Sequence, residues 1–186
     1  WDYVFRRLYL TVCPDLTTAE FQPAQVLDDV SRTGGMIHAM DLAMAPGGAL
    51  LLLYRRQQTT APMRKLVFPS VPDKVTLEWR ELGATGAALR QATLPDPEPG
   101  QELTWGRLVA LPGGGHHLLA TSTGTAAGQR IQRNWLLRLT PDLGEFQPLA
   151  TDPVLDQFYV ANVRGGNTPT ATTEAIGTGS FQGLLH

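Results

Sequence analysis

The amino-acid sequence contains two copies of one pattern, and this internal repeat constrains the fold more than any other feature. Near the start, Cys-Pro-Asp-Leu at 13–16 is followed by Glu-Phe-Gln-Pro at 20–23; near the end, Thr-Pro-Asp-Leu at 140–143 is followed by Glu-Phe-Gln-Pro at 145–148. The aspartates of the two copies are 142 − 15 = 127 residues apart. A shorter repeat, Ala-Pro-Gly-Gly at 45–48 and Leu-Pro-Gly-Gly at 111–114, has an offset of 112 − 46 = 66 residues. Repeats at a nearly fixed spacing indicate a fold built from similar units, here of about 60 residues each.

Turn-forming residues divide the chain into short segments. The 186 residues include 19 Gly and 14 Pro, and 42% of all residues are hydrophobic. No stretch has a sustained apolar period of 3.6 residues, and the best helical candidate, at 18–30, contains Pro23, which disfavours a helix interior. The other apolar segments are short and lie between turn signals, a pattern typical of a meandering antiparallel protein. We therefore predict an all-β fold.

The predicted strands form two complete units and two half units. The unit at 36–94 has strands at 37–44, 49–56, 75–82 and 88–94. The unit at 103–150 has strands at 105–111, 116–122, 134–139 and 146–150. The half unit at 1–30 has strands at 3–12 and 21–27, and the half unit at 156–186 has strands at 158–163 and 168–176. Because half units at opposite ends of a chain commonly close a ring of sheets, we treat 1–186 as one domain.

The order of strands, turns and loops resembles a known family. A Pro-Gly-Gly turn follows the first strand of both complete units, and an Asp-Gly turn follows a Trp-bearing strand at 134–139. This order is similar to that of the BNR or Asp-box β-propellers, the superfamily that includes sialidases, and residues 105–148 resemble one blade. Of the family's Asp-box, Ser/Thr-x-Asp-x-Gly-x-Thr-Trp, the chain keeps Thr140, Asp142 and Gly144, whereas the aromatic residue, Phe146, comes one position early.

The resemblance implies propeller-like repeats of four-stranded antiparallel sheets. The chain supplies only about three units, whereas propellers typically have four to eight blades. We therefore expect a partial propeller, or half of a ring that two copies of the chain complete. The aspartates of the repeated motif, Asp15 and Asp142, are expected to accept backbone N–H bonds within their turns and to have no part in catalysis.

Several classes of function are disfavoured by composition and motifs. The net charge of −2 argues against nucleic acid as a partner. The single cysteine, Cys13, excludes a disulfide within the chain, and the longest apolar run, at 49–54, is too short to span a bilayer. Adjacent residues on a strand point to opposite faces, so His116 and His117 do not predict a metal site. The glycines at 113–115 and 165–166 indicate tight turns without the helix or lysine of a phosphate cradle, and we expect no cofactor.

If the resemblance holds, a ligand site lies at the mouth of the central channel. It is lined by the starts of first strands, the ends of second strands and the loops between them, where Arg55 and Arg130 also fall. The ligand-binding residues that we predict are Arg32, His38, Arg56, Trp105, Arg107 and Tyr159. Arginine suits planar, bidentate recognition of a carboxylate. His38 and Tyr159 are also a candidate base and acid pair, as in some propeller lyases of acidic polysaccharides. The structural alternative is that these residues are solvated rim arginines and a packed histidine.

The sequence favours a non-catalytic role, because it shows no catalytic signature and fold alone does not fix function. We predict a structural or interaction module that binds a protein partner or a glycan, and we assign no catalytic residue. One alternative is a sialidase-like glycoside hydrolase or a polysaccharide lyase; another is an accessory subunit of a larger complex, with a homodimer as a further possibility. The chain begins at Trp1, so we expect a processed or excerpted piece of a longer protein, in an extracytoplasmic (secreted or periplasmic) location.

Overall fold

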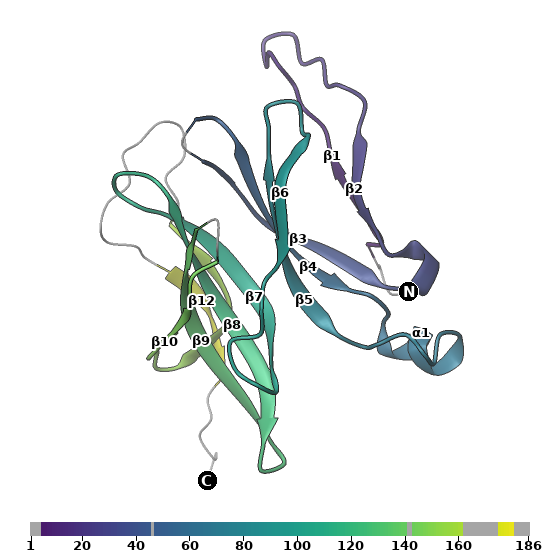
Figure 1. The fold of residues 1–186 in the computed structure, drawn as a ribbon, viewed down its shortest axis with the longest axis vertical. Helices are drawn as coiled ribbons and strands as arrows, with labels where there is room; N and C mark the ends of the chain where they lie inside the picture. The colour runs from purple at the N-terminus through teal and green to yellow at the C-terminus, as the bar shows by residue number, and fades with distance from the viewer. Residues whose placement is uncertain (1–4, 46, 141–142, 162–174, 181–186) are drawn as a thin grey trace.

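The computed structural model describes residues 5–45, 47–140, 143–161 and 175–180. Four antiparallel sheets follow one another along this part of the chain (Figure 1). The N-terminal sheet pairs β1 (Arg7–Leu10) with β2 (Gln25–Asp29), and the C-terminal sheet pairs β11 (Val154–Val160) with β12 (Ala175–Ser180). Sheet I contains β3 (Met36–Met44), β4 (Leu50–Gln57), β5 (Val75–Leu82) and β6 (Ala88–Thr93). Sheet II contains β7 (Gln101–Ala110), β8 (His116–Ala126), β9 (Gln129–Leu139) and β10 (Phe146–Leu149).

The prediction of an all-β chain with four-stranded antiparallel sheets is confirmed. Within each sheet, every strand pairs with the next one along the chain. The turns before β4 and β8 have matching hydrogen bonds: the Ala45 N–H donates to the Ala49 carbonyl at 2.7 Å, and the Leu111 N–H donates to the Gly115 carbonyl at 3.1 Å. Gly48 and Gly114 adopt φ values of 85° and 96°, which L side chains rarely do. The repeated Gly-Gly motif thus builds the same turn twice.

The sheets pack against one another through their faces. One core lies between sheets I and II and reaches β11, where Leu53, Leu77, Leu118 and Phe158 are fully buried. A second core lies on the other face of sheet I, where Ile37, Leu52, Tyr54 and Leu82 pack against the N-terminal sheet. Burial of each such side chain stabilises the fold by about 1.5–3 kcal/mol. The N-terminal and C-terminal sheets therefore cover opposite sides of the central pair of sheets (Figure 1).

The contact between one sheet and the next recurs along the chain. The strand β1 contacts β3, β5 contacts β7, and β9 contacts β11. In sheets I and II, β5 and β9 are both the third strand, and each contacts the first strand of the following sheet. The same strand-to-strand relationship therefore holds at both of these boundaries.

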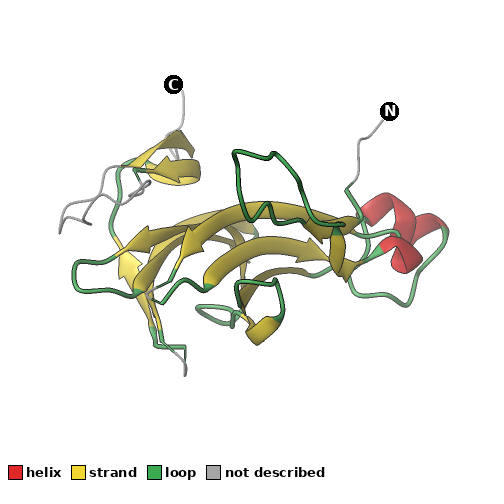
Figure 2. Ribbon diagram, turned by 90° about the horizontal axis from the view of Figure 1, so that it is seen from above, coloured by secondary structure: helices red, strands yellow, loops and turns green. Residues whose placement is uncertain are grey.

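Several predicted elements differ from the observed ones. A short helix, α1 (Ala61–Leu66), lies between the strands predicted at 49–56 and 75–82, where no helix was predicted. Thr60 is its N-cap, and Pro62 lies in its first turn, where proline is tolerated. A single 3-10 turn, η1 (Ser31–Thr33), precedes β3. These helical segments lie at one end of the molecule, away from the C-terminal sheet (Figure 2). The strands β7 and β11 each begin four residues before their predicted starts, at Gln101 and Val154.

Some predicted features fall outside the described residues. These are Trp1, Pro46 of the first Pro-Gly-Gly turn, Asp142 of the Asp-box, the Gly165–Gly166 turn and the first part of the strand at 168–176. Within the described part of the chain, Asp15 behaves as predicted, because its Oδ1 accepts a hydrogen bond from the Thr17 backbone N–H at 2.8 Å. None of the helices described has the length and apolar character that crossing a membrane requires.

Candidate functional site

A pocket of about 560 Å³ lies where β3, β7 and β11 begin. These three strands contribute His38, Trp105 and Tyr159 to its lining, and the ends of β4 and β8 add Arg55 and Thr123. Its other lining residues are Met40, Val75, Glu102, Thr104, Arg130, Asp156 and Gln157. The pocket is therefore built from sheet I, sheet II and the C-terminal sheet together, in the region where the core between the sheets opens to solvent.

A β-bulge in each of the three strands helps to shape this pocket. In β3 the pairing passes from Ala39 to Asp41, and in β7 it passes from Leu103 to Trp105. The strand β11 repeats the irregularity between Leu155 and Gln157. A bulge leaves one residue unpaired, bends the strand and re-aims side chains, and bulges are frequent next to functional sites.

The three residues at the bulges converge on one place. They are Met40, Thr104 and Asp156, and all of them line the pocket. Their spacings are 104 − 40 = 64 and 156 − 104 = 52 residues, so successive units supply an equivalent residue to the same site.

Aromatic rings form one wall of the pocket. The centres of the Trp105 and Tyr159 rings are 6.4 Å apart in an edge-to-face arrangement, and His38 lies 6.0 Å from Trp105 on its other side. The Trp105 indole N–H donates a hydrogen bond to the Phe158 carbonyl at 2.9 Å, which fixes the ring between β7 and β11. Tyr159 is 60% exposed, so its ring offers an accessible face to a ligand.

The charged groups of the pocket differ in whether they have partners. Asp156 accepts a hydrogen bond from the side-chain amide of Gln132 at 2.8 Å. In contrast, the Nε of Arg55 is buried and forms no hydrogen bond with the described residues. Burial lowers the pKa of Arg55, and the nearby Glu102 carboxylate partly opposes this effect. The pKa of His38 is lowered by burial, and further by the charges of Arg55 and Arg107, so its imidazole is mainly uncharged at neutral pH.

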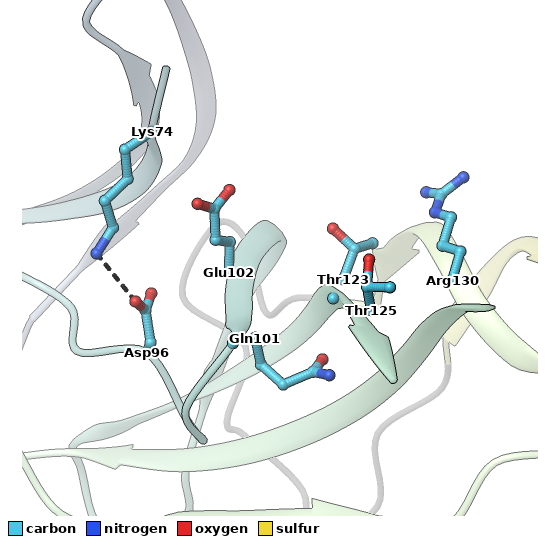
Figure 3. A pocket seen from close by; sticks show the side chains of 9 residues that line it. Lys74, Asp96, Gln101, Glu102, Thr123, Thr125 and Arg130 are labelled. Carbon is cyan, nitrogen blue, oxygen red and sulfur yellow. Dashed lines mark hydrogen bonds and ion pairs between the residues drawn. The ribbon is translucent and has the colours of Figure 1, made fainter. Parts of the chain in front are cut away.

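A groove of about 650 Å³ adjoins the pocket at the starts of β7 and β9 and the end of β8 (Figure 3). The groove and the pocket share Glu102, Thr123 and Arg130. The groove is further lined by Gln101, Thr125, Lys74 and Asp96, together with Gly100 and Gly124. The ammonium group of Lys74 forms an ion pair with Asp96 at 2.9 Å. Because of the shared residues, the pocket and the groove form one continuous depression.

The structure brings together only part of the predicted ligand set. His38, Trp105 and Tyr159 line the pocket. Arg107 lies behind them: it is 92% buried, its guanidinium stacks on the rings of Trp105 and Tyr159, and its Nε donates to the Phe158 carbonyl at 3.1 Å. Arg107 thus positions the two aromatic rings and is not among the lining residues.

The two remaining residues of that set lie elsewhere. Arg56 is on the opposite face of sheet I, where its Nε forms an ion pair with Asp28 at 3.1 Å. Arg32 is exposed in η1, away from the pocket lining.

Several lining residues were not predicted from the sequence, mainly because β7 and β11 begin earlier than predicted. Glu102, Thr104 and Asp156 lie just before the predicted strand starts at 105 and 158. A sequence signal for the earlier start of β7 was present, because Leu103 and Trp105 are apolar and two positions apart. The bulge at Thr104 nevertheless pairs them with adjacent residues of β8, Ser122 and Thr121. No comparable alternation precedes Phe158, since Asp156 and Gln157 are both polar.

The described residues contain no group of three or more His, Cys, Asp or Glu side chains that could hold a metal ion. His116 is buried and His117 is half-buried, and burial lowers the pKa of both side chains. Cys13 is half-buried, and its thiol donates to the Asp15 carbonyl at 3.2 Å. These residues therefore do not form a second centre next to the pocket.

Comparison of the chain with models of protein families, with curated proteins and with solved structures finds no match. The resemblance to the Asp-box propellers consequently stays a prediction from the sequence motifs. The site has to be interpreted from its own geometry and chemistry.

Proposed function

We propose that this chain is a segment of a β-propeller that binds the acidic unit of a glycan in the pocket between β3, β7 and β11, without catalysing a reaction. Support for the propeller comes from the repeated contacts of β5 with β7 and β9 with β11, and from the equivalent bulges in three successive units. In such a ring, first strands line the central channel, so the pocket occupies its mouth.

The observation that carries the proposal is the buried Nε of Arg55, a pocket-lining residue, which forms no hydrogen bond with the described residues. A buried donor without a partner costs about 1–3 kcal/mol, and a ligand carboxylate would remove that cost by accepting its hydrogen bonds. The ring of Tyr159, which is 60% exposed, provides apolar surface in the same pocket for the C–H groups of a sugar. The size of the pocket suits one unit of a small ligand, whereas a stable protein partner needs a broad surface.

The test is isothermal titration of the protein with glucuronic acid and with glucose. We expect glucuronic acid to bind and glucose to bind much more weakly. Arg55→Ala should weaken binding of glucuronic acid about 10- to 100-fold, because it removes a charge-assisted hydrogen-bond donor. Arg64→Ala, which removes the same charge from the exposed face of α1, is the matched control and should bind normally. Equal affinity for the two sugars, or an unaffected Arg55→Ala variant, would refute the proposal.

A second candidate function, a polysaccharide lyase, is favoured by the uncharged His38 beside Tyr159 in the same pocket. In this reaction His38 takes the proton next to the uronate carboxylate, and the Tyr159 hydroxyl protonates the sugar oxygen as the C–O bond breaks. The product carries a new C=C bond. Incubation with hyaluronan or polygalacturonate, followed by ultraviolet absorbance of the unsaturated uronate, tests it. If neither polymer gives the unsaturated product although glucuronic acid still binds, the lyase function is excluded and the non-catalytic function stands.

A closed ring needs more sheets than the described residues form, and we propose a second copy as their source. The test is the mass in solution, measured by size-exclusion chromatography with light scattering. A particle of twice the 20.2 kDa chain mass supports a two-copy ring. A folded monomer excludes that assembly but leaves the pocket unaffected, because all of its described lining residues come from one chain.

A further inference from the structure

We propose that the groove beside the pocket binds the uncharged sugar unit next to the acidic one, so that the ligand is an oligosaccharide and not a single sugar. This inference rests on the proposed function of the pocket. It assigns a role to Gln101, Thr125 and Arg130, which line the groove.

The groove is continuous with the pocket. Glu102, Thr123 and Arg130 line both depressions, and Figure 3 shows their side chains pointing the same way from sheet II, with Thr123 between Glu102 and Arg130. A ligand that occupies the pocket therefore has a direct path into the groove. Each depression falls within the volume range of ordinary ligand sites, and together they suit a ligand of more than one unit.

The groove is lined by a polar group, the side-chain amide of Gln101, that hydrogen bonds within the protein hold in place. The indole N–H of Trp135 donates to Ser122 Oγ at 2.7 Å, and Ser122 Oγ donates to Gln101 Oε1 at 2.8 Å. All three residues are buried or nearly so. The relay fixes the Gln101 amide, whose nitrogen donates no hydrogen bond to the described residues and is available to a sugar hydroxyl.

A glycine preserves the room for this amide. A Cβ atom at Gly124 would lie 2.5 Å from the Gln101 side-chain nitrogen and would also clash with the carbonyl of Gly100. Any side chain at Gly124 would therefore displace the amide. The absence of a side chain at Gly124 therefore lets β8 lie close to Gly100 and Gln101 at the start of β7.

The charged side chains of the groove do not favour a second acidic sugar. The ammonium group of Lys74 is already paired with Asp96, and the Glu102 carboxylate lies between the pocket and the groove. The groove's other cation, Arg130, is matched in number by Glu102, so the formal charges of the lining side chains cancel and give no net attraction for a second carboxylate. The hydroxyls of Thr123 and Thr125 and the Gln101 amide instead suit the hydroxyl and acetamido groups of an uncharged sugar.

The test uses sugars of increasing length on the whole chain. Glucuronic acid, a hyaluronan tetrasaccharide (alternating acidic and uncharged units) and a galacturonate tetramer (acidic units only) are titrated separately. We expect the hyaluronan tetrasaccharide to bind about tenfold more tightly than glucuronic acid, the gain from two additional hydrogen bonds. The galacturonate tetramer should show no such gain.

Two variants test whether the tighter binding of the hyaluronan tetrasaccharide comes from the groove. Thr125→Trp fills the groove from an exposed position, and Gln101→Ala removes the fixed amide; both should cancel the gain from the longer sugar and leave glucuronic acid binding unchanged. Thr85→Ala, an exposed position outside the groove, is the control. If glucuronic acid binds but length has no effect, or the galacturonate tetramer gains equally, the groove proposal is wrong and the pocket proposal stands. If no probe binds, the proposed function fails and the groove proposal fails with it.

Discussion

His38 on β3 lies directly across from Arg55 on β4 in the antiparallel register of sheet I. Opposite residues of paired strands share one face of the sheet, so the imidazole and the guanidinium both belong to the pocket. The next pair, Ile37 and Arg56, must point to the other face, where Ile37 is buried against the N-terminal sheet. This register decides which of two adjacent arginines lines the pocket.

The pairing predicts how ligand binding depends on pH. The pKa of His38 lies below its usual value of 6.5, so lowering the pH from neutral adds a positive charge beside Arg55. Binding of glucuronic acid should therefore strengthen as the pH falls from about 7 to about 5, because its own carboxyl stays ionised there. Titrations at both pH values check this.

Two variants separate this effect from other titrating groups. His38→Gln should remove the pH dependence, whereas His117→Gln, at a half-buried position on β8 outside the pocket, should keep it. Binding that weakens at low pH in the unmodified protein would contradict the prediction. A lyase shows the opposite dependence in its turnover, since its base must be unprotonated to accept a proton.

The stacking of Arg107 between two rings predicts a large effect on stability. Its guanidinium carbon lies 4.4 Å from the Tyr159 ring centre and 4.9 Å from that of Trp105. Arg107→Ala removes both contacts and the hydrogen bond to the Phe158 carbonyl, so we expect a loss of about 2–4 kcal/mol in the free energy of unfolding. Urea denaturation measures this value. Arg138→Ala, at an exposed position on β9, should change it by less than about 0.5 kcal/mol, and equal losses for the two variants would argue against the positioning role.

The order of the sheets was predictable because turn chemistry is local. Each Gly-Gly segment requires backbone angles that few residues tolerate, so the ends of β3 and β7 and the starts of β4 and β8 can be placed from the sequence. The starts of β7 and β11 were not predictable in this way. Polar residues such as Glu102 and Asp156 serve the pocket there, and they break the apolar pattern that marks a strand.

The faces of the strands were harder to predict than their order. Arg56 was included in the expected ligand set, yet Arg55 lines the pocket. A bulge shifts the side-chain alternation by one residue, and no residue type marks the bulges in β3, β7 and β11, since Met40, Thr104 and Asp156 have no common chemistry. Only the three-dimensional register resolves this ambiguity.

Tyr54 predicts a second dependence on pH, in stability. Its hydroxyl donates to Asp28 Oδ2 at 3.0 Å, and burial, followed by the negative charge of Asp28, raises its pKa well above the usual value of 10.0. The unfolded chain therefore loses this proton at a lower pH than the folded protein does. The stabilisation is complete below about pH 10 and is lost as the pH rises further.

The measurement compares unfolding in urea at about pH 8 and about pH 11. The unmodified protein should lose more stability over this range than Tyr54→Phe, which cannot ionise at that position. Tyr9→Phe, at a position that is 52% exposed, should behave like the unmodified protein. An identical pH dependence in Tyr54→Phe and the unmodified protein would contradict the assignment.

The packing of sheet I against sheet II predicts that Gly106 tolerates no side chain. A Cβ atom there would lie 2.9 Å from Leu118 Cδ1, 3.0 Å from Leu53 Cδ2 and 3.1 Å from Leu77 Cδ1. All three leucines are fully buried, so they have little room to move. Gly106→Ala should therefore lower the free energy of unfolding by about 1–3 kcal/mol, as overpacking of a core commonly does.

Gly83→Ala is the matched control, because a Cβ at that position meets no atom closer than 3.7 Å. Reduced backbone entropy of the unfolded chain should leave this variant unchanged or slightly more stable. If Gly106→Ala were as stable as the control, the two sheets would be farther apart in solution than in the structure. The pocket would then lose its shape, since sheet I holds Arg55 and His38 and sheet II holds Trp105. Glucuronic acid binding by Gly106→Ala, measured by the same titration, therefore reports on the sheet-to-sheet contact from the ligand side.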